Sequence, residues 1–138
     1  MIIRLHHIGI ASKNIEKDQK FFELFSYKNK GQLREDKKTD ISVQFMSGDL
    51  LPDIELVSNL TSGEGPVTPY LQSRRKIFHL AFETDDINAD LREFVDNNNA
   101  VLLAPITYVK DNNTDIKAWC YLMFRNAMIV EVVEIKKV

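Results

Sequence analysis

Two histidines and two glutamates stand at matching places in this chain. His7 and His79 occupy strand-like segments, and Glu55 and Glu131 lie inside short aliphatic runs. Neutral imidazoles and carboxylates suit Zn, Ni and Co, and they are also accepted by Mn and Fe. Two neutral and two anionic ligands would balance the charge of one divalent ion, and an octahedral ion would keep two positions for substrate oxygens. These residue types therefore predict a site for one divalent transition metal ion.

An internal repeat relates the two halves of the chain. The segments His7–Ile15 and His79–Ile87 align with histidine on histidine and isoleucine on isoleucine, 72 residues apart. Each segment is typical of a strand followed by a helix, because Asn14 and Asp86 suit the N-cap position. The repeat also selects His7 over His6, to which we assign a structural role.

Apolar residues at helical spacing follow both predicted caps. They are Ile15, Phe21, Phe22 and Phe25 in the first half and Ile87, Leu91, Phe94 and Val95 in the second. Further strand-like runs are Tyr27–Leu33, Ile41–Met46 and Ile54–Val57, then Val101–Ile106, Ala118–Phe124 and Val130–Val133. Each half is thus expected to form a strand, a helix and about three more strands, which is an α+β pattern.

The alternation of a strand decides where the two glutamates point. Glu55 and Glu131 must each face away from the aliphatic residues on either side of them. If those aliphatic residues pack under the helices, both glutamates lie on the other face of the sheet. Taken singly, each of the four polar residues is more simply an ordinary strand residue, and the matched set favours a shared site.

Length and composition are those of one ordinary globular domain. The chain has 138 residues, 44% of them hydrophobic and 28% charged, with a net charge of −2. The charge gives no reason to expect nucleic acid, and no apolar run approaches the roughly 20 residues that cross a bilayer. The single cysteine, Cys120, excludes an internal disulfide, and no signal peptide is apparent. We expect a cytoplasmic protein with module one at about 1–58, a linker at about 59–69 and module two at about 70–138.

The motifs around the four residues resemble the vicinal-oxygen-chelate superfamily, which includes glyoxalases, bleomycin resistance proteins and dioxygenases. They are His-Ile-Gly-Ile at 7–10, Ile-Glu-Leu at 54–56, Phe-His-Leu-Ala-Phe at 78–82 and Ile-Val-Glu-Val at 129–132. The resemblance covers the whole chain and is closest to glyoxalase I and methylmalonyl-CoA epimerase. It implies two tandem βαβββ modules that form a cupped, barrel-like sheet around the metal, in a small-molecule enzyme that is a homodimer. Whether one chain or two would complete the site stays open.

Comparison with the two branches favours glyoxalase I by a small margin. The order His, Glu, His, Glu is that of glyoxalase I, whereas the epimerase has Gln where this chain has Glu55. Gln44 stands where the epimerase has a proton-transferring carboxylate, and we expect it to contact the substrate. Against glyoxalase I, Ala11 replaces a glutathione-binding arginine, although Asn59 resembles a glutathione contact. The expected substrate is a thioester or 2-oxo compound.

In both branches the resemblance implies that a proton is removed from carbon next to a carbonyl, while the metal stabilises the enediolate as a Lewis acid. Glu131 would be the base and Glu55 would return the proton. Other expected substrate contacts are Arg74 and Arg75, which begin a basic run that is more simply a solvated turn, and Trp119, which packing explains equally well. A binding protein without catalysis and a ring-cleaving dioxygenase are the rival classes. The four ligands and the short chain argue against both.

Overall fold

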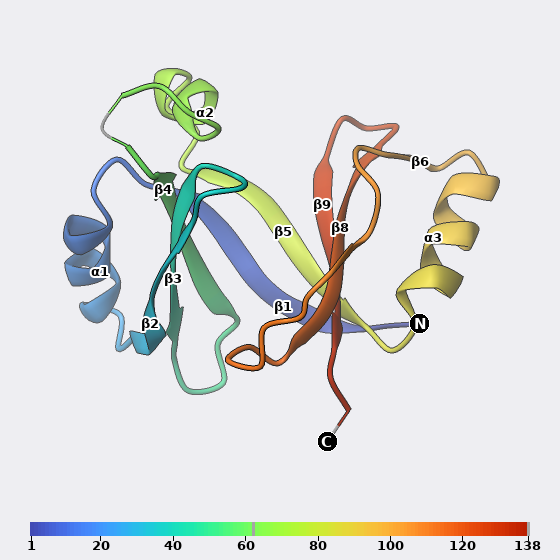
Figure 1. Cartoon of the computed structure of the whole chain (residues 1–138), viewed down its shortest axis with the longest axis horizontal. Helices are drawn as coiled ribbons and strands as arrows, with labels where there is room; N and C mark the ends of the chain where they lie inside the picture. Colours follow the sequence, from blue (N-terminus) through green and yellow to red (C-terminus); the bar gives the residue numbers. More distant parts are fainter. Residues whose placement is uncertain (62, 138) are drawn as a thin grey trace. The chain divides into compact units, whose positions relative to one another are not determined.

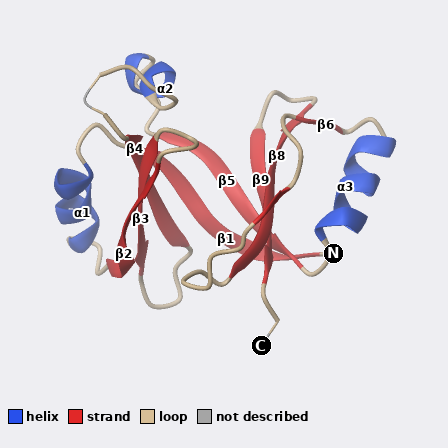
Figure 2. Ribbon diagram, viewed as in Figure 1, coloured by secondary structure: helices blue, strands red, loops and turns tan. Residues whose placement is uncertain are grey.

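The structure is a computed structural model that describes residues 1–61 and 63–137 (Figure 1). The described residues form helices and strands in the order expected for an α+β fold. The elements are β1 (Ile2–Ala11), α1 (Ile15–Glu23), β2 (Lys28–Asp36), β3 (Ile41–Ser47), β4 (Asp53–Asn59), α2 (Thr68–Gln72), β5 (Ile77–Thr84), α3 (Ile87–Asp96), β6 (Ala100–Leu102), β7 (Thr107–Tyr108), β8 (Ile116–Phe124) and β9 (Ile129–Ile135). The predicted α+β class, with a strand, a helix and further strands in each half, is confirmed (Figure 2).

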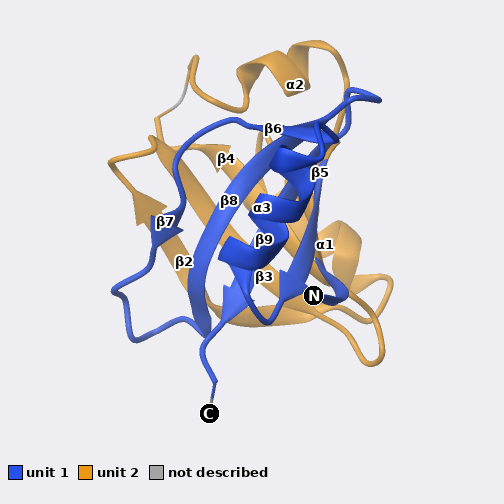
Figure 3. Cartoon of the chain, turned by 90° about the vertical axis from the view of Figure 1, so that its right-hand side faces the viewer, with its two compact units in different colours: residues 1–6, 79–138 blue, residues 7–78 orange. Residues whose placement is uncertain are grey.

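The chain forms two compact units that do not coincide with a cut at the middle of the sequence. Unit 1 comprises Met1–His6 and His79–Val138, and unit 2 comprises His7–Phe78 (Figure 3). One boundary therefore falls inside β1. Residue 62 of the expected linker and residue 138 lie outside the described residues, and the last two positions of that linker begin α2.

Unit 2 is built on a sheet with the strand order β2-β3-β4-β1. The pairs β2–β3 and β3–β4 are antiparallel, and β1 runs parallel to β4. One face is covered by α1, whose Ile15 and Phe22 pack against a buried cluster of Ile10, Tyr27, Met46, Ile54 and Leu56. At the edge of the sheet, β2 is exposed at every position.

Two aromatic residues of the first predicted helix face are not in this core. Phe21 is 51% exposed and Phe25 is 58% exposed, so these two residues at helical spacing are not part of the buried face. The reason is local, because α1 ends at Glu23 and Phe25 follows beyond it. The two rings pack on each other instead, with centroids 5.3 Å apart.

A second cluster in unit 2 lies under α2. Buried Ala11, Val57 and Val67 pack with Tyr70 and Leu71 of this short helix and with partly buried Ile41, Val43 and Phe78. Small Ala11 is fully buried there, which explains why this position holds no long side chain.

Unit 1 repeats the scheme with the strand order β5-β9-β8-β6, and β7 pairs with β8. The pair β5–β9 is parallel, whereas β8–β9 and β6–β8 are antiparallel. Its core joins α3 to the sheet through Ile87, Leu91, Ala100, Ala118, Cys120, Leu122 and Val132. Val95 at the end of α3 is 36% exposed, so it lies at the margin of the predicted face.

The predicted strand Val101–Ile106 is mostly absent. Only Ala100–Leu102 forms β6, and the chain then leaves the sheet before the two-residue strand β7. Pro105 lacks a backbone N–H and cannot continue the ladder of hydrogen bonds. The strand β6 is therefore much shorter than its counterpart β2.

Both predicted helix caps are present. The Asn14 side chain accepts a hydrogen bond from Lys17 N at 3.0 Å, and the Asp86 side chain accepts one from Ala89 N at 3.0 Å. Each cap satisfies a backbone donor that the first turn of a helix would otherwise leave unpaired. Within residues 1–61 and 63–137, no helix is both long enough and apolar enough to cross a membrane.

Candidate metal centre

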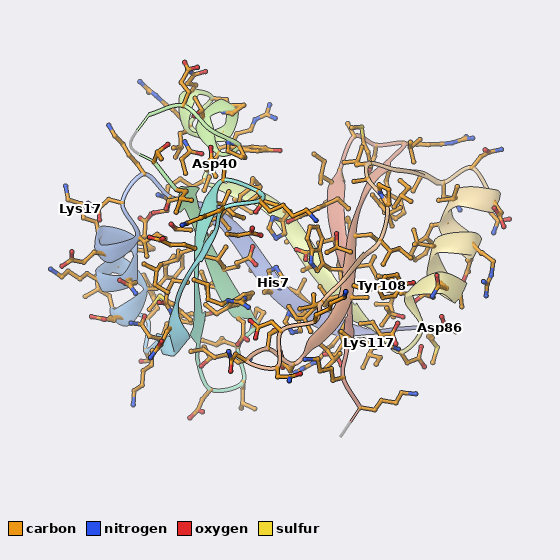
Figure 4. The ribbon with its side chains drawn as sticks, viewed as in Figure 1. His7, Lys17, Asp40, Asp86, Tyr108 and Lys117 are labelled. Carbon is orange, nitrogen blue, oxygen red and sulfur yellow. The ribbon has the colours of Figure 1, made fainter. Side chains whose placement is uncertain are left out.

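In unit 2, His7 and Glu55 face each other across the parallel pair β1–β4. Gly9 is the register partner of Glu55, so His7, two residues earlier, lies on the same face of the sheet. The His7 Nε2 and Glu55 Oε2 atoms are 3.8 Å apart, and the two side chains are 0% and 13% exposed. Figure 4 labels His7 on β1. The neighbours of Glu55, Ile54 and Leu56, lie in the core with α1, as the alternation predicts.

In unit 1, His79 and Glu131 form the corresponding pair across β5–β9. Ala81 is the register partner of Glu131, which again puts the histidine two residues earlier on the same face. The His79 Nε2 and Glu131 Oε2 atoms are 3.1 Å apart, and the side chains are 0% and 6% exposed. Val132 is buried in the core with α3, and Val130 packs against it.

The donor chemistry of the two pairs suits a divalent transition ion. Each pair supplies one imidazole and one carboxylate, and each residue offers one ligand atom. Histidine and glutamate residues that are almost fully buried require a partner such as each other or an ion. Nitrogen and oxygen donors of this kind are those that zinc and its neighbours prefer.

Each histidine also has an aromatic neighbour. The Phe45 ring meets His7 edge-to-face at 5.3 Å and 89°, and the Tyr121 ring meets His79 in the same way at 5.3 Å and 84°. Phe45 is the register partner of Glu55, and Tyr121 is that of Glu131. Both aromatic residues stand ten positions before their glutamate, and this shared spacing is a signal that the sequence already contained.

Gln44 lies on the opposite face of β3 from the His7–Glu55 pair. Its register partner is Leu56, whose side chain is in the core with α1, and Phe45 occupies the Glu55 face. The Gln44 amide donates to Gly31 O at 3.2 Å and to Phe45 O at 2.8 Å. These two hydrogen bonds give Gln44 a structural role on that face, and its expected contact with substrate stays a prediction.

Asn59 is engaged in shaping the segment that leads to α2. Its Oδ1 accepts from Val67 N at 2.9 Å, and its Nδ2 donates to Gly63 O at 3.1 Å and Thr68 Oγ1 at 3.0 Å. Within unit 2, these three hydrogen bonds give the Asn59 side chain a structural role in the loop, and this role does not require a ligand.

The basic run after α2 is exposed, as a solvated turn would be. Arg74 and Arg75 lie between α2 and β5 with exposed side chains. Lys76 forms an ion pair with Asp18 of α1 at 2.9 Å. Within unit 2, the structure gives this run a surface position and does not associate it with the His7–Glu55 pair.

Trp119 and Cys120 point to opposite faces of β8. The Trp119 ring contacts that of Tyr121, with centroids 5.5 Å apart, on the Glu131 face. Cys120 is 1% exposed and lies in the core with α3. Burial raises the pKa of its thiol to about 11, which makes it a poor nucleophile and a poor metal ligand at neutral pH.

Comparison with known proteins identifies the family. The model of the Glyoxalase/Bleomycin resistance protein/Dioxygenase superfamily matches residues 6–118. The chain belongs to this superfamily. The superfamily predicted from the four motifs is thereby confirmed, and its members include enzymes and proteins that only bind their ligands.

Solved structures of similar fold span nearly the whole chain. A hypothetical protein from Bacillus halodurans C-125 is 21% identical, with a TM-score of 0.79 and coverage of 98% of this chain and 96% of that one. Methylmalonyl-CoA epimerase from Mycobacterium tuberculosis is 15% identical, with a TM-score of 0.82 and coverage of 99% and 90%. A Streptomyces coelicolor methylmalonyl-CoA epimerase, solved with 2-nitronate-propionyl-CoA, is 15% identical, with a TM-score of 0.75 and coverage of 99% and 100%. At these identities the similarity shows the fold alone. The search of curated proteins found no match.

Proposed function

We propose that His7, Glu55, His79 and Glu131 together hold one divalent transition metal ion, and that the protein is an enzyme that removes a proton from carbon next to a carbonyl. The main support for this proposal is that the same histidine–glutamate pair occurs in both units, with 3.8 Å and 3.1 Å between Nε2 and Oε2. One pair supplies only two ligands, whereas protein zinc sites generally use three or four. Two pairs on one ion satisfy this requirement.

The residues of the two pairs have distinct roles in this proposal. A bound divalent ion would act as a Lewis acid toward the carbonyl oxygen of the substrate. Glu131 takes the proton from the neighbouring carbon, and Glu55 returns a proton on the other side. His7 and His79 hold the centre, with their rings oriented by Phe45 and Tyr121. The low exposure of all four side chains limits competing water.

The substrate that we propose first is a thiohemiacetal or related 2-oxo compound, converted in a glyoxalase I-like lyase or isomerase reaction. Four metal-ligating side chains, including Glu55, support this choice, because they match the glyoxalase order. Epimerisation of an acyl-CoA is the alternative. On β3, the position next to Glu55 is occupied by Phe45, which cannot transfer a proton. An epimerase would therefore use Glu55 and Glu131 as its two proton-transfer groups. Cytoplasmic location and a homodimer stay predictions.

Metal stoichiometry tests the shared centre. We expect about one Zn, Ni or Co ion per chain after loading and desalting, measured by mass spectrometry. Either His7→Ala or His79→Ala should remove most of the metal, because both pairs serve one ion. His6→Ala is the matched control, since this buried neighbour points to the other face of β1. Two ions per chain, or a half-loaded His7→Ala protein, would show separate sites and overturn the proposal.

Proton exchange tests the chemistry. The loaded protein is offered methylglyoxal with glutathione and, separately, methylmalonyl-CoA in deuterated water, and NMR follows deuterium at the carbon next to the carbonyl. Formation of a thioester from methylglyoxal supports the first substrate class. Deuterium at C2 of the CoA ester without that thioester would support the epimerase instead. No exchange with any 2-oxo compound or acyl thioester tested, in a protein that binds metal, would contradict the proposed reaction.

A further inference from the structure

We propose that Trp119 and Tyr121 form an aromatic subsite for a planar, conjugated group of the substrate, beside the His79–Glu131 pair. This inference rests on the proposed function, since it concerns the same centre. It narrows the substrate class to compounds that carry an aromatic or similarly flat group next to the reacting carbonyl.

The placement of the two rings is fixed by the register of β8 against β9. Tyr121 pairs with Glu131 and Trp119 pairs with Val133, so both aromatic side chains rise from the Glu131 face. The Tyr121 ring touches His79 at 5.3 Å, and the Trp119 ring touches Tyr121 at 5.5 Å and 74°. The result is a continuous aromatic row that begins at the proposed metal ligand.

Exposure distinguishes this row from core packing. On the other face of β8, Ala118, Cys120 and Leu122 are at most 1% exposed beneath α3. Trp119 and Tyr121 are only partly buried, although they stand among those residues in the same strand. Large aromatic side chains that keep an accessible surface beside a buried polar pair are typical lining residues of a small-molecule site.

The corresponding position in unit 2 has a different neighbour. The Arg34 guanidinium lies 6.0 Å from the centroid of the Phe45 ring and thus engages the aromatic face there. Phe45 also has Val43, an aliphatic residue, at the position where Tyr121 has Trp119. A flat ligand group is therefore assigned to the Trp119–Tyr121 row and not to Phe45.

Aromatic stacking predicts the size of the preference. An aromatic contact contributes about 0.5–1.5 kcal/mol beyond area burial, which corresponds to about twofold to tenfold in affinity. A saturated ring of similar size has no π system, so it would gain only the burial. The ratio of the two affinities isolates the aromatic contribution.

Binding of two matched probes tests the subsite. Phenylglyoxylate and cyclohexylglyoxylate share the 2-oxo acid and differ in the planarity of the ring. Trp119 is the one tryptophan of the chain, so its fluorescence reports directly on the subsite. With metal-loaded protein we expect phenylglyoxylate to bind about twofold to tenfold more tightly and to change the emission of Trp119. Calorimetry measures the same affinities independently of fluorescence.

Variants identify the residues responsible. Trp119→Leu and Tyr121→Leu should each reduce the preference toward equal affinity, measured by calorimetry. Tyr108→Leu is the control, because Tyr108 is an exposed aromatic residue of β7 that pairs with Ala118 on the opposite face. Circular dichroism melting identifies the variants that are folded. If one variant is unfolded, the ratio of the two probe affinities in the wild-type protein still tests the subsite. Equal affinities in the wild-type protein, or an unchanged preference in both folded Leu variants, would overturn the subsite. A protein that binds no metal would instead contradict the proposed function.

Discussion

The two units place the same pair of residues on the same scaffold and then surround it differently. In unit 1 the pair is closer and more buried, with 3.1 Å between Nε2 and Oε2 and a Glu131 side chain that is 6% exposed. In unit 2 the distance is 3.8 Å and the Glu55 side chain is 13% exposed. The aromatic neighbour is Tyr121 in one unit and Phe45 in the other.

The repeat therefore preserves the two histidine–glutamate pairs, while the residues around each pair differ. The parallel pairs β1–β4 and β5–β9 each set a histidine two residues before the partner of a glutamate. This arrangement requires only that side chains alternate along each strand and that the opposite face of the sheet is buried. The Arg34 guanidinium lies over the Phe45 ring, whereas the Tyr121 ring contacts the Trp119 ring. Equal metal ligation with unequal substrate contact is the expected consequence.

The largest expected effect distinguishes the two glutamates. Glu131→Gln keeps an oxygen donor but removes the proposed base, so turnover should fall by about 10²–10⁴-fold while metal is retained. Glu55→Gln should cost less, because it affects the return of the proton. The measurement is the initial rate on whichever substrate shows exchange, with bound metal determined on the same samples. Full activity of the Glu131→Gln protein, or a larger loss for Glu55→Gln, would reverse the assignment of roles.

The next effect concerns the two cores. Leu122 in unit 1 and Leu56 in unit 2 are both 0% exposed. Replacement of either leucine by alanine should lower the free energy of unfolding by about 2–5 kcal/mol, because it removes buried methyl groups and leaves a cavity. Urea unfolding followed by circular dichroism measures both. Leu33→Ala on the exposed strand β2 is the control. Losses below about 1 kcal/mol at either leucine would mean that its core is not packed as described.

A smaller effect tests whether the two helix starts are equivalent. Asn14→Ala and Asp86→Ala should each destabilise the protein by about 0.5–2 kcal/mol, since each cap accepts one backbone N–H at 3.0 Å. Thermal melting of both variants and of the wild-type protein gives the comparison. Asn14→Ser and Asp86→Ser should recover most of the loss, because serine is also a good cap. Stability equal to wild type in an alanine variant would show that its cap contributes nothing.

The last effect is confined to alkaline pH and to unit 1. Burial raises the pKa of the Cys120 thiol from 9.0 to about 11, so the unfolded chain releases this proton first as pH rises. The contribution of Cys120 to stability is thus complete below pH 9.0 and is lost as pH approaches about 11. Unfolding of wild type and of Cys120→Ala across this range measures it. Rapid reaction of the native protein with iodoacetamide at pH 8 would contradict the burial.

The sequence predicted the parts of the centre that depend on short-range rules. The alternation around Glu55 and Glu131 put both carboxylates away from the helices, and Asn14 and Asp86 marked the helix starts. These inferences need only the geometry of one strand or one turn. The match of His7 with His79 also predicted which residues of the two halves occupy equivalent positions, because the two copies of a repeat share the same strand positions.

What the sequence did not predict depends on pairing between strands. Gln44 and Phe45 differ by one position, and a shift of one residue exchanges the faces of a strand. Only the register with β4 shows that Phe45 shares the face of Glu55. Phe25 likewise has helical spacing, yet α1 ends before it. Such errors arise because burial is decided by tertiary contacts that periodicity alone does not specify.

The division of β1 between the units has a consequence for the order of events during protein synthesis. Residues 1–6 belong with unit 1, where Arg4 pairs with Glu83 at 2.7 Å and Asp85 binds the amino group of Met1. The ribosome produces these residues long before Glu83 and Asp85 emerge. Unit 2 has all of its own strands once residue 78 is available, so it can form first. Residues 1–6 of β1 then remain unpaired until the strands of unit 1 have been synthesised. During that time this strand end is accessible to chaperones and to incorrect pairing.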